Sequence, residues 1–289
     1  MSSKLLRALL PLLLAAPAAA GEPLAVLSAG TGAYMESFSA FQASYGREVP
    51  YFDMAGGKPA IPAGTSLIVA FGGKAANYAY PAGIPVIYCM APGFFSKHGA
   101  PEGRSVKITL IPEFGKILGQ LKEIQPGLKR LSGLWMSPSF NQFEEPLKAA
   151  GQALGIEVSV VKVSDSEDLP ALLRQVNGNA DALWLPPDPL LISPENLMML
   201  RDFSWANGIP FYGSTKGMTR EGAAASVGVS FGDMGATAAE AARRLQAGEN
   251  LPELIFPARM ELTLNASAAR KCGLKFQPEI LKKANYLFP

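Results

Sequence analysis

The chain has 289 residues, of which 48% are hydrophobic and 17% are charged, and its 26 basic side chains nearly balance its 24 acidic ones. No cluster of Lys and Arg forms the positive face that nucleic acids require, so the composition argues against nucleic-acid binding. The length exceeds that of a typical single hydrophobic core and favours two domains.

The first twenty residues are typical of an export signal. Lys4 and Arg7 provide a basic start, residues 8–14 form a short apolar stretch, and the alanines at 18–20 form a small-residue cleavage site. The stretch is too short to span a membrane, and no Cys follows it that could carry a lipid anchor. Two of the 26 basic residues and none of the 24 acidic ones lie in this segment, which leaves 24 of each. We therefore expect a periplasmic protein that neither spans the membrane nor carries a lipid anchor.

Short apolar runs alternate with amphipathic stretches along the rest of the chain, which predicts an α/β fold built from βαβ units with parallel sheets. Strands are expected at 24–27, 67–71, 86–90, 131–136, 158–163, 182–185, 209–212, 225–229 and 259–264. Helices are expected at 34–45, 73–80, 114–124, 144–154, 169–177, 194–207, 234–247, 266–272 and 278–285. The Gly- and Pro-rich stretch at 91–112 separates two sets of strands and is a candidate domain boundary.

Most of the predicted strands end in a turn of small or polar residues. These turns lie at 28–30, 72–73, 91–93, 137–139, 186–188 and 213–215. In open parallel sheets, ligands bind at the carboxyl ends of the strands. Two such sheets that face each other would bring all six turns to one cleft.

The cysteines and the single histidine bear on metal binding and catalysis. Cys89 and Cys272 could form one disulfide. However, they are far apart in the sequence and we expect them in two different lobes, whose relative movement a disulfide would lock. We therefore favour two separate buried thiols. His98 lies in a Gly-rich loop and is interpreted as a solvated residue. With a single His, the sequence favours neither a metal site nor a Ser-His-Asp hydrolase, and no cofactor is expected.

Asp188 is the leading candidate for ligand binding. It lies between Pro187 and Pro189, directly after a predicted buried strand. A carboxylate there could accept hydrogen bonds from a ligand ammonium. The alternative is that it caps the next helix. However, Ser193 and Pro194 already provide a cap and a first helical residue, which leaves Asp188 without an obvious structural role.

Polar residues at other strand ends are further candidates. Ser137, Ser139 and Asn141 follow one strand, and their hydroxyls and nearby backbone N–H groups could bind a carboxylate or phosphate or could simply cap a helix. Ser28 has the same two interpretations. Gly72 lets the backbone approach a ligand or merely makes a tight turn.

The remaining candidates combine apolar and polar contacts. Tyr212 offers a stacking face and a hydroxyl, and Ser214 follows it. Met90 is a candidate for the pocket wall. Phe231 lies at a predicted crossover beside the cleft, and Asp233 could cap a helix that starts at residue 234.

Three stretches carry a resemblance to a known family. The stretch "KRLSGLWMSPSFNQFEEPLKAAGQALGIEVSVVKVS" is similar to the start of the second lobe of ABC-transporter substrate-binding proteins of the tryptophan/tyrosine-binding kind. The stretch "ADALWLPPDPLLISPENLMMLRDFSWANGIPFYGSTKGMTREGAAASVGVSFGDMGATAAEAARRLQAGE" resembles their most distinctive segment, and "LIVAFGGKAANYAYPAGIPVIYCMAP" resembles their first-lobe core.

The resemblance implies a type I periplasmic-binding fold, in which two Rossmann-like lobes are joined by hinge crossovers. Carried onto this chain, the crossovers lie near 106–110, 229–231 and 260–262. Lobe one would comprise 22–107 and 230–259, and lobe two 108–229 and 260–289. Thr215 stands where the family often has an acid, and prolines flank Asp188 where polar residues are usual. Both departures leave room for a more apolar ligand.

The resemblance also implies a function without chemistry. A monomeric binding protein would capture a small organic solute, amino-acid-like or more hydrophobic, and would deliver it to an ABC permease. One alternative is a ligand-sensing or scaffold partner of a membrane signalling protein. Another is an exported hydrolase that uses Ser137 or Asp188.

Overall fold

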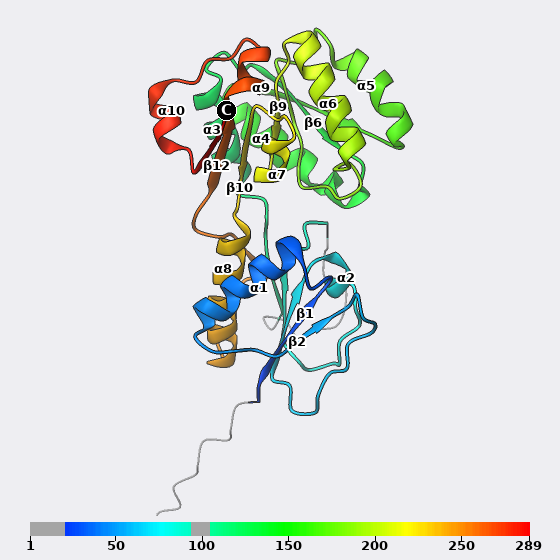
Figure 1. Ribbon diagram of the computed structural model, residues 1–289, viewed down its shortest axis with the longest axis vertical. Coiled ribbons are helices and arrows are strands. Elements are labelled where there is room, and N and C mark those ends of the chain that lie inside the picture. Colours follow the sequence, from blue (N-terminus) through cyan, green and yellow to red (C-terminus); the bar gives the residue numbers. More distant parts are fainter. Residues whose placement is uncertain (1–20, 94–104) are drawn as a thin grey trace, which may run out of the picture.

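The computed structural model describes residues 21–93 and 105–289. The expected export signal and His98 lie outside these residues. The chain forms two lobes, one above the other, and each is built on one sheet (Figure 1). Lobe one contains the chain's first strands, and lobe two contains most of its second half.

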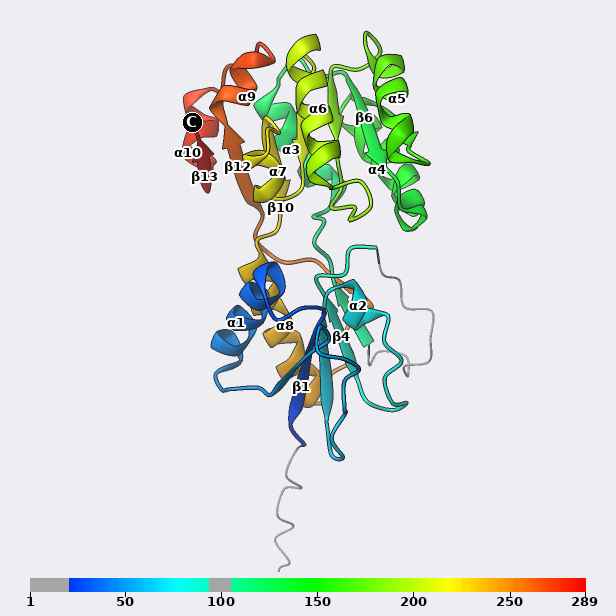
Figure 2. The ribbon, with the colours of Figure 1, turned by 45° about the vertical axis from the view of Figure 1, so that its right-hand side comes forward.

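The sheet of lobe one has six strands, and all its pairs are parallel. They are β1 (Pro23–Leu27), β2 (Tyr51–Asp53), β3 (Leu67–Phe71), β4 (Val86–Cys89), β5 (Ser105–Ile108) and β11 (Leu254–Ile255), in the order β11-β5-β4-β3-β1-β2. Its helices are α1 (Gly32–Tyr45), α2 (Gly73–Ala76) and α8 (Phe231–Gln246). Figure 2 shows α1 and α8 on one side of this sheet and α2 on the other.

Close packing of α1 on α8 explains the Gly- and Ala-rich sequence of α8. A Cβ on Gly235 would collide with the backbone carbonyl of Ser37 in α1. Phe38 and Phe41 of α1 lie in the same core, each with its ring centroid 5.9 Å from that of Phe71. Small residues on one helix thus let aromatic residues on the other reach the sheet.

The sheet of lobe two has seven strands. They are β6 (Arg130–Trp135), β7 (Glu157–Lys162), β8 (Ala182–Trp184), β9 (Phe211–Gly213), β10 (Ala225–Gly228), β12 (Glu261–Asn265) and β13 (Tyr286–Phe288), in the order β13-β12-β10-β9-β8-β6-β7. The pair of β10 and β12 is antiparallel and the other pairs are parallel.

Helices cover both faces of the second sheet, and each face has its own apolar core. They are α3 (Phe114–Ile124), α4 (Glu144–Ala153), α5 (Leu169–Val176), α6 (Pro194–Asn207), α7 (Lys216–Arg220), α9 (Ala266–Lys271) and α10 (Pro278–Lys283), with 3-10 turns η1 (Pro138–Phe143) and η2 (Ser166–Asp168). Two-sided burial explains why β8 and β9 consist of apolar residues and glycine.

Three connections cross between the lobes. They run from β5 to α3, from β10 to α8 and from β11 to β12, through residues 109–113, 229–230 and 256–260. The three connections lie side by side at the waist of the molecule (Figure 1). They lie at or close to the crossovers that the family resemblance implies, and they give the two lobes a hinge.

All the predicted strands and helices are present, with ends shifted by up to four residues. The largest differences are in α2, which ends at Ala76, and in α8, which begins at Phe231 rather than at residue 234. Four short strands, β2, β5, β11 and β13, and the helix α7 were not predicted. Cys89 lies in lobe one and Cys272 in lobe two, and both are buried and free. Among the described residues, no helix is long and apolar enough to cross a membrane.

Candidate functional site

Chain direction places the carboxyl ends of the central strands of both sheets at the interface between the lobes. β5 leads into lobe two, and β4, β3 and β1 are parallel to it. β10 leads into lobe one, and β9, β8 and β6 are parallel to it. The six turns that the sequence singles out therefore lie on the facing edges of the two lobes, as expected for a ligand site of this topology.

The loops after β4 and β6 approach each other across this interface. A Cβ on Gly93 of lobe one would lie 2.7 Å from Ser139 Oγ and 3.8 Å from Ser137 Oγ of lobe two. The two serine hydroxyls are 2.7 Å apart and hydrogen-bonded to each other. Nearby, Asn141 Oδ1 accepts a hydrogen bond of 3.0 Å from the indole N–H of Trp135, so its side chain is held against lobe two. The two serines thus face lobe one, and the Asn141 side chain beside them is held by its hydrogen bond to Trp135.

Asp188 lies behind the loop after β6 that carries Ser137 and Ser139, which we call the serine loop. Asp188 is fully buried, with 0% exposure. Its Oδ2 accepts hydrogen bonds of 2.7 Å from the backbone N–H groups of both Met136 and Ser137, and its Oδ1 accepts one of 3.0 Å from Leu190 N–H. The sequence argument that Asp188 has no structural role is therefore wrong. A contact between Asp188 and a ligand stays a prediction.

The three prolines around Asp188 explain how a buried strand can end in a carboxylate. Asp188 N–H donates to the carbonyl of Pro186 over 2.8 Å, and the Asp188 carbonyl accepts from Leu191 and Ile192 at 3.1 and 3.0 Å. The prolines bring no further donors that would need partners. Ser193 then caps α6 by accepting from Asn196 N–H, as the sequence predicts. The prolines thus restrict the backbone of the turn, and the turn places one carboxylate next to the loop after β6.

In lobe one, three predicted residues lie together at the ends of β1, β3 and β4. Ser28 Oγ accepts a hydrogen bond of 3.0 Å from Ala75 N–H in α2. Gly72 has a φ of +96°, and a Cβ there would lie 2.5 Å from both Ser28 Oγ and Tyr34 Cε1. Met90 has a φ of +58°, in the left-handed region that a non-Gly residue rarely adopts, and it is buried against the core. Glycine and strained backbone thus shape this edge, which is typical of ligand sites.

Two predicted residues of lobe two use their polar atoms within the protein. The Tyr212 ring is buried in the core and its hydroxyl donates to Gln125 Oε1 over 2.8 Å. Burial also raises the pKa of Tyr212. Ser214 Oγ is buried and donates to the Leu185 carbonyl over 2.8 Å. Their ligand contacts stay predictions. In this conformation, both hydroxyls donate their hydrogen bonds to other residues of lobe two.

Phe231 begins α8 at the second crossover and packs against the core of lobe one. The cap of this helix is Ser230, whose Oγ accepts from Asp233 N–H over 3.0 Å and donates to Asp233 Oδ2 over 2.7 Å. The prediction that Asp233 caps a helix starting at residue 234 is therefore wrong. The reciprocal Ser–Asp bonds extend the helix by one turn towards the hinge.

Sequence reasoning missed Asp53, which ends β2 at the same edge of lobe one. Its Oδ1 accepts a hydrogen bond of 2.8 Å from Ala55 N–H. A Cβ on Gly30 would lie 2.6 Å from Asp53 Oδ2, so this carboxylate lies against the turn after β1. The three-residue strand β2 gives almost no periodic signal, and only the Asp-x-Ala-Gly-Gly turn after it marks the place.

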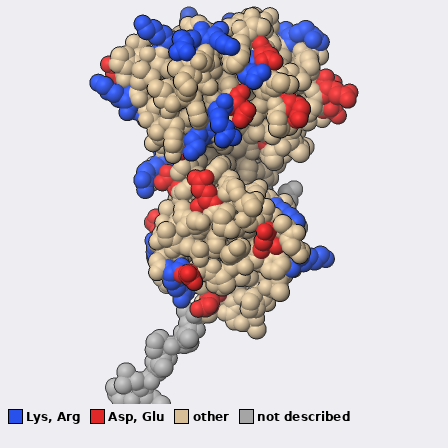
Figure 3. All heavy atoms as spheres, in the orientation of Figure 1, with Lys and Arg blue, Asp and Glu red and all other residues tan. Residues whose placement is uncertain are grey.

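Charged side chains from both lobes meet on one side of the hinge. Arg259 Nε lies 3.2 Å from Asp233 Oδ1. Burial raises the pKa of Glu261 in β12. The nearby Lys216 lowers this pKa, and the negative charges of Glu36 and Asp233 raise it. Figure 3 shows acidic and basic side chains at the waist between the lobes. Charged groups of both lobes thus lie near one another outside the serine loop.

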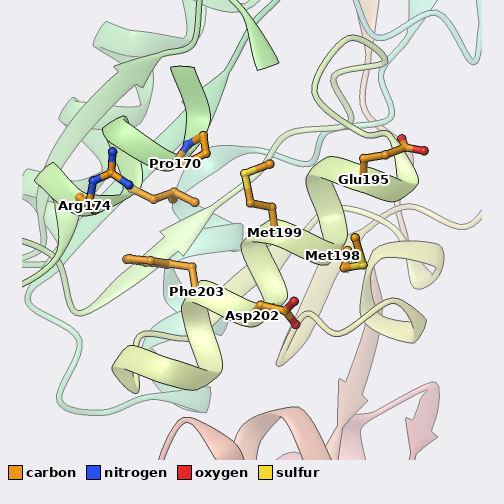
Figure 4. Close-up of a pocket in the computed structure, with 8 residues that line it drawn as sticks. Pro170, Arg174, Glu195, Met198, Met199, Asp202 and Phe203 are labelled. Carbon is orange, nitrogen blue, oxygen red and sulfur yellow. The ribbon is translucent and has the colours of Figure 1, made fainter. Parts of the chain in front are cut away.

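A separate groove lies on the outer face of lobe two, between α5 and α6 (Figure 4). It has a volume of about 470 Å³, and its apolar lining includes Leu173, Met198, Met199 and Phe203. Arg174 lies on its α5 side. None of its lining residues belongs to the turns at the interface between the lobes, so it is not part of the candidate site.

The interface between the lobes offers hydroxyls, backbone groups and apolar side chains. In the part of the chain that the structure describes, no group of three or more His, Cys, Asp and Glu side chains could hold a metal ion. Ser137 Oγ is hydrogen-bonded to Ser139 Oγ, and a serine hydroxyl is not a general base that could activate it as a nucleophile. Such an arrangement can hold a small solute by hydrogen bonds and apolar contact.

Comparisons with known proteins agree with this architecture. Residues 113–287 match the family model described as ABC transporter substrate binding protein. No curated protein matches the sequence. Among solved structures, the chain is similar to a ligand-free, open substrate-binding protein with adhesive properties from Clostridium difficile, with a TM-score of 0.69, 16% identity, and coverage of 93% of this chain and 99% of that one.

Two further structures have the same fold. One is an ABC domain in complex with L-Trp from Streptococcus pneumonia, with a TM-score of 0.68, 17% identity, and coverage of 93% of this chain and 100% of that one. The other is a conserved domain protein from Vibrio cholerae O1, with a TM-score of 0.67, 14% identity, and coverage of 93% and 99%. The two-lobed fold is thus the type I periplasmic-binding fold, as expected.

Proposed function

Because the chain belongs to the family of ABC transporter substrate-binding proteins, we propose that it captures a small organic solute between its lobes and delivers it to an ABC permease. The observation that carries this proposal is the approach of Gly93 in lobe one to Ser137 and Ser139 in lobe two. This approach lies where the strand ends of both sheets face each other. A solute held there would touch both lobes at once.

Lobe closure is the proposed mechanism. Residues 22–107 and 230–259 form one moving unit, and 108–229 and 260–289 form the other, which is supported by the strands that each sheet contains. A solute that makes contacts with both units only when they close shifts the open–closed equilibrium. The permease then recognises the closed form. No covalent chemistry is involved, and the protein acts in the periplasm as a monomer.

The proposed ligand contacts come from both lobes. The set comprises Ser28, Gly72, Met90 and Phe231 in lobe one and Ser137, Ser139, Asn141, Tyr212 and Ser214 in lobe two, and Asp188 contributes through the loop that it holds. The structural neighbour from Streptococcus pneumonia binds L-Trp, and it shares the fold at 17% identity. An aromatic or more apolar solute fits the apolar residues around the two serines.

A thermal-shift screen tests this function. L-Trp, L-Tyr, L-Phe and aromatic carboxylates are added to the purified protein, and a hit is titrated by calorimetry. We expect at least one saturable ligand whose affinity falls when Ser137 and Ser139 are both changed to Ala. A ligand whose affinity does not respond to these changes would place the site elsewhere.

A further inference from the structure

We infer that Asp188 is a positioning residue, which holds the serine loop in place. The serine loop forms one wall of the proposed site, and a solute there meets hydroxyls and apolar side chains and forms no ion pair with Asp188. The inference deepens the proposed function and rests on it. It also concerns the class of solute, because a wall without an accessible charge does not select for an ammonium group.

The first support is that the Asp188 carboxylate is already occupied. A carboxylate has about four lone-pair positions for hydrogen bonds. Three of them are used by the N–H groups of Met136, Ser137 and Leu190, at 2.7, 2.7 and 3.0 Å. The side chain has 0% exposure, so a ligand ammonium could reach it only if the loop moved away. Losing these charge-assisted bonds would oppose such a movement.

The second support is the composition of the turns at the interface between the lobes. The turns 28–30, 72–73, 91–93, 137–139, 186–188 and 213–215 contain one charged residue, which is Asp188. Met136, Pro138 and Phe140 alternate with the two serines in the sequence, so the immediate chain neighbours of both serines are apolar. A buried charge that faces away from solvent leaves this wall neutral to a solute.

The third support is the hydrogen balance of the serine pair. Ser137 and Ser139 together carry two hydroxyl hydrogens, and the bond between them uses one. The other can be donated to a ligand oxygen. The oxygen of an alcohol, an amide or a carboxylate on an apolar or aromatic solute can accept this hydrogen bond, so such a solute needs no ammonium group to bind here.

In the described part of the chain, four charged side chains lie near these turns, and three of them are engaged within the protein. Lys107 Nζ donates to the Pro92 carbonyl over 3.1 Å. Lys74 Nζ donates to the Met54 carbonyl, and Lys216 Nζ lies 4.1 Å from the centre of the Tyr286 ring. The fourth, Asp53, uses one oxygen to accept a hydrogen bond from Ala55 N–H, and it lies against Gly30. Asp53 is thus the rival anionic contact for an ammonium group, and the test includes it.

Amide hydrogen exchange on the ligand-free protein tests the positioning role. In Asp188→Asn, a side-chain NH₂ replaces one acceptor oxygen and faces backbone donors. We expect the Met136, Ser137 or Leu190 amides to exchange at least about tenfold faster than in the native protein, with core amides such as Val69 unchanged. Asp165→Asn is the matched control, because Asp165 also accepts from a backbone N–H, that of Glu167, but is exposed. Unchanged exchange in Asp188→Asn would overturn the inference.

A matched solute series tests the ligand class. L-phenylalanine, 3-phenylpropionate and 3-phenyl-1-propanol share one ring and chain length and differ in their charged groups. We expect the two solutes without ammonium to bind within about threefold of L-phenylalanine or tighter. A preference of tenfold or more for L-phenylalanine that Asp188→Asn removes would overturn the inference. The same preference removed by Asp53→Asn would show that the site selects an ammonium group through Asp53 and would overturn the ligand class.

A double-mutant cycle separates positioning from direct contact. If Asp188 acts through the serines, Asp188→Asn weakens binding of the tightest solute in the native background but has little further effect after Ser137→Ala and Ser139→Ala. Additive losses would mean direct contact and would contradict the inference. If none of the three solutes binds, the proposed function loses support, while the exchange comparison still decides the role of Asp188.

Discussion

The carboxylate of Asp188 accepts a 2.7 Å hydrogen bond from the backbone N–H of Ser137, although 51 positions separate the two residues in the sequence. This bond joins the turn after β8 to the loop after β6, and the hydroxyl of Ser137 then faces the other lobe. A buried acid thereby fixes the shape of a surface that it does not itself form.

Asp188→Ala should destabilise lobe two. Three backbone N–H groups lose their acceptor, and a buried donor without a partner costs about 1–3 kcal/mol, so we expect a loss of about 3 kcal/mol or more. Urea unfolding with a lobe-two probe measures this loss. Asp165→Ala, at an exposed cap, should cost about 1 kcal/mol. Equal effects of the two changes would contradict the structural role of Asp188.

Gly93→Ala should hinder approach of the lobes. The added Cβ would lie 2.7 Å from Ser139 Oγ, so one of the two loops must move. We expect weaker solute binding and a larger radius of gyration by X-ray scattering, with little change in unfolding free energy. Adding Ser139→Ala to Gly93→Ala should restore the compact form. A variant as compact as the native protein would show that the loops do not meet in solution.

Gly235→Ala should destabilise lobe one, because a Cβ there would collide with the backbone of Ser37 in α1. Overpacking of this kind costs about 1–3 kcal/mol. Gly119→Ala in α3 is the control: a Cβ there meets nothing within 4 Å, and Ala favours a helix, so this change should stabilise. Denaturant unfolding of the two variants should therefore shift in opposite directions, and parallel shifts would refute the packing argument.

Glu261→Gln should stabilise the protein at neutral pH. The pKa of Glu261 is raised by burial and by Glu36 and Asp233, against the opposing effect of Lys216. A carboxyl whose pKa is raised on folding opposes folding above the folded pKa, and this penalty disappears as pH falls below the unfolded value of about 4.3. The difference in melting temperature between Glu261→Gln and native protein should be positive at pH 7 and should shrink towards pH 4. A difference that grows on acidification would have the wrong sign.

Much of the fold could be predicted from local patterns. The helix at 194–207 has the predicted ends because Ser193, Pro194 and Gly208 are local start and stop signals. The strands β2, β5, β11 and β13 were missed because two to four residues carry too little periodicity, and pairing with distant strands defines them.

The site was harder to predict because its decisive contacts are distant in sequence. The hydroxyl of Tyr212 donates a hydrogen bond to Gln125, which is 87 positions away in the sequence. The carboxylate of Asp188 accepts one from Ser137, which is 51 positions away. Strand ends could be located from the sequence, since turn residues mark them. The direction of each side chain at a strand end depends on neighbours that only the folded chain brings together.

Native mass spectrometry of protein purified from the periplasm tests the central claim most directly. The mass is recorded before and after mild unfolding and refolding. We predict a small organic solute that is released on unfolding and that rebinds to the native protein but less well to the variant with Ser137 and Ser139 both changed to Ala. If the native protein carries no solute and also binds none from a broad panel, the chain does not act as a solute-binding protein.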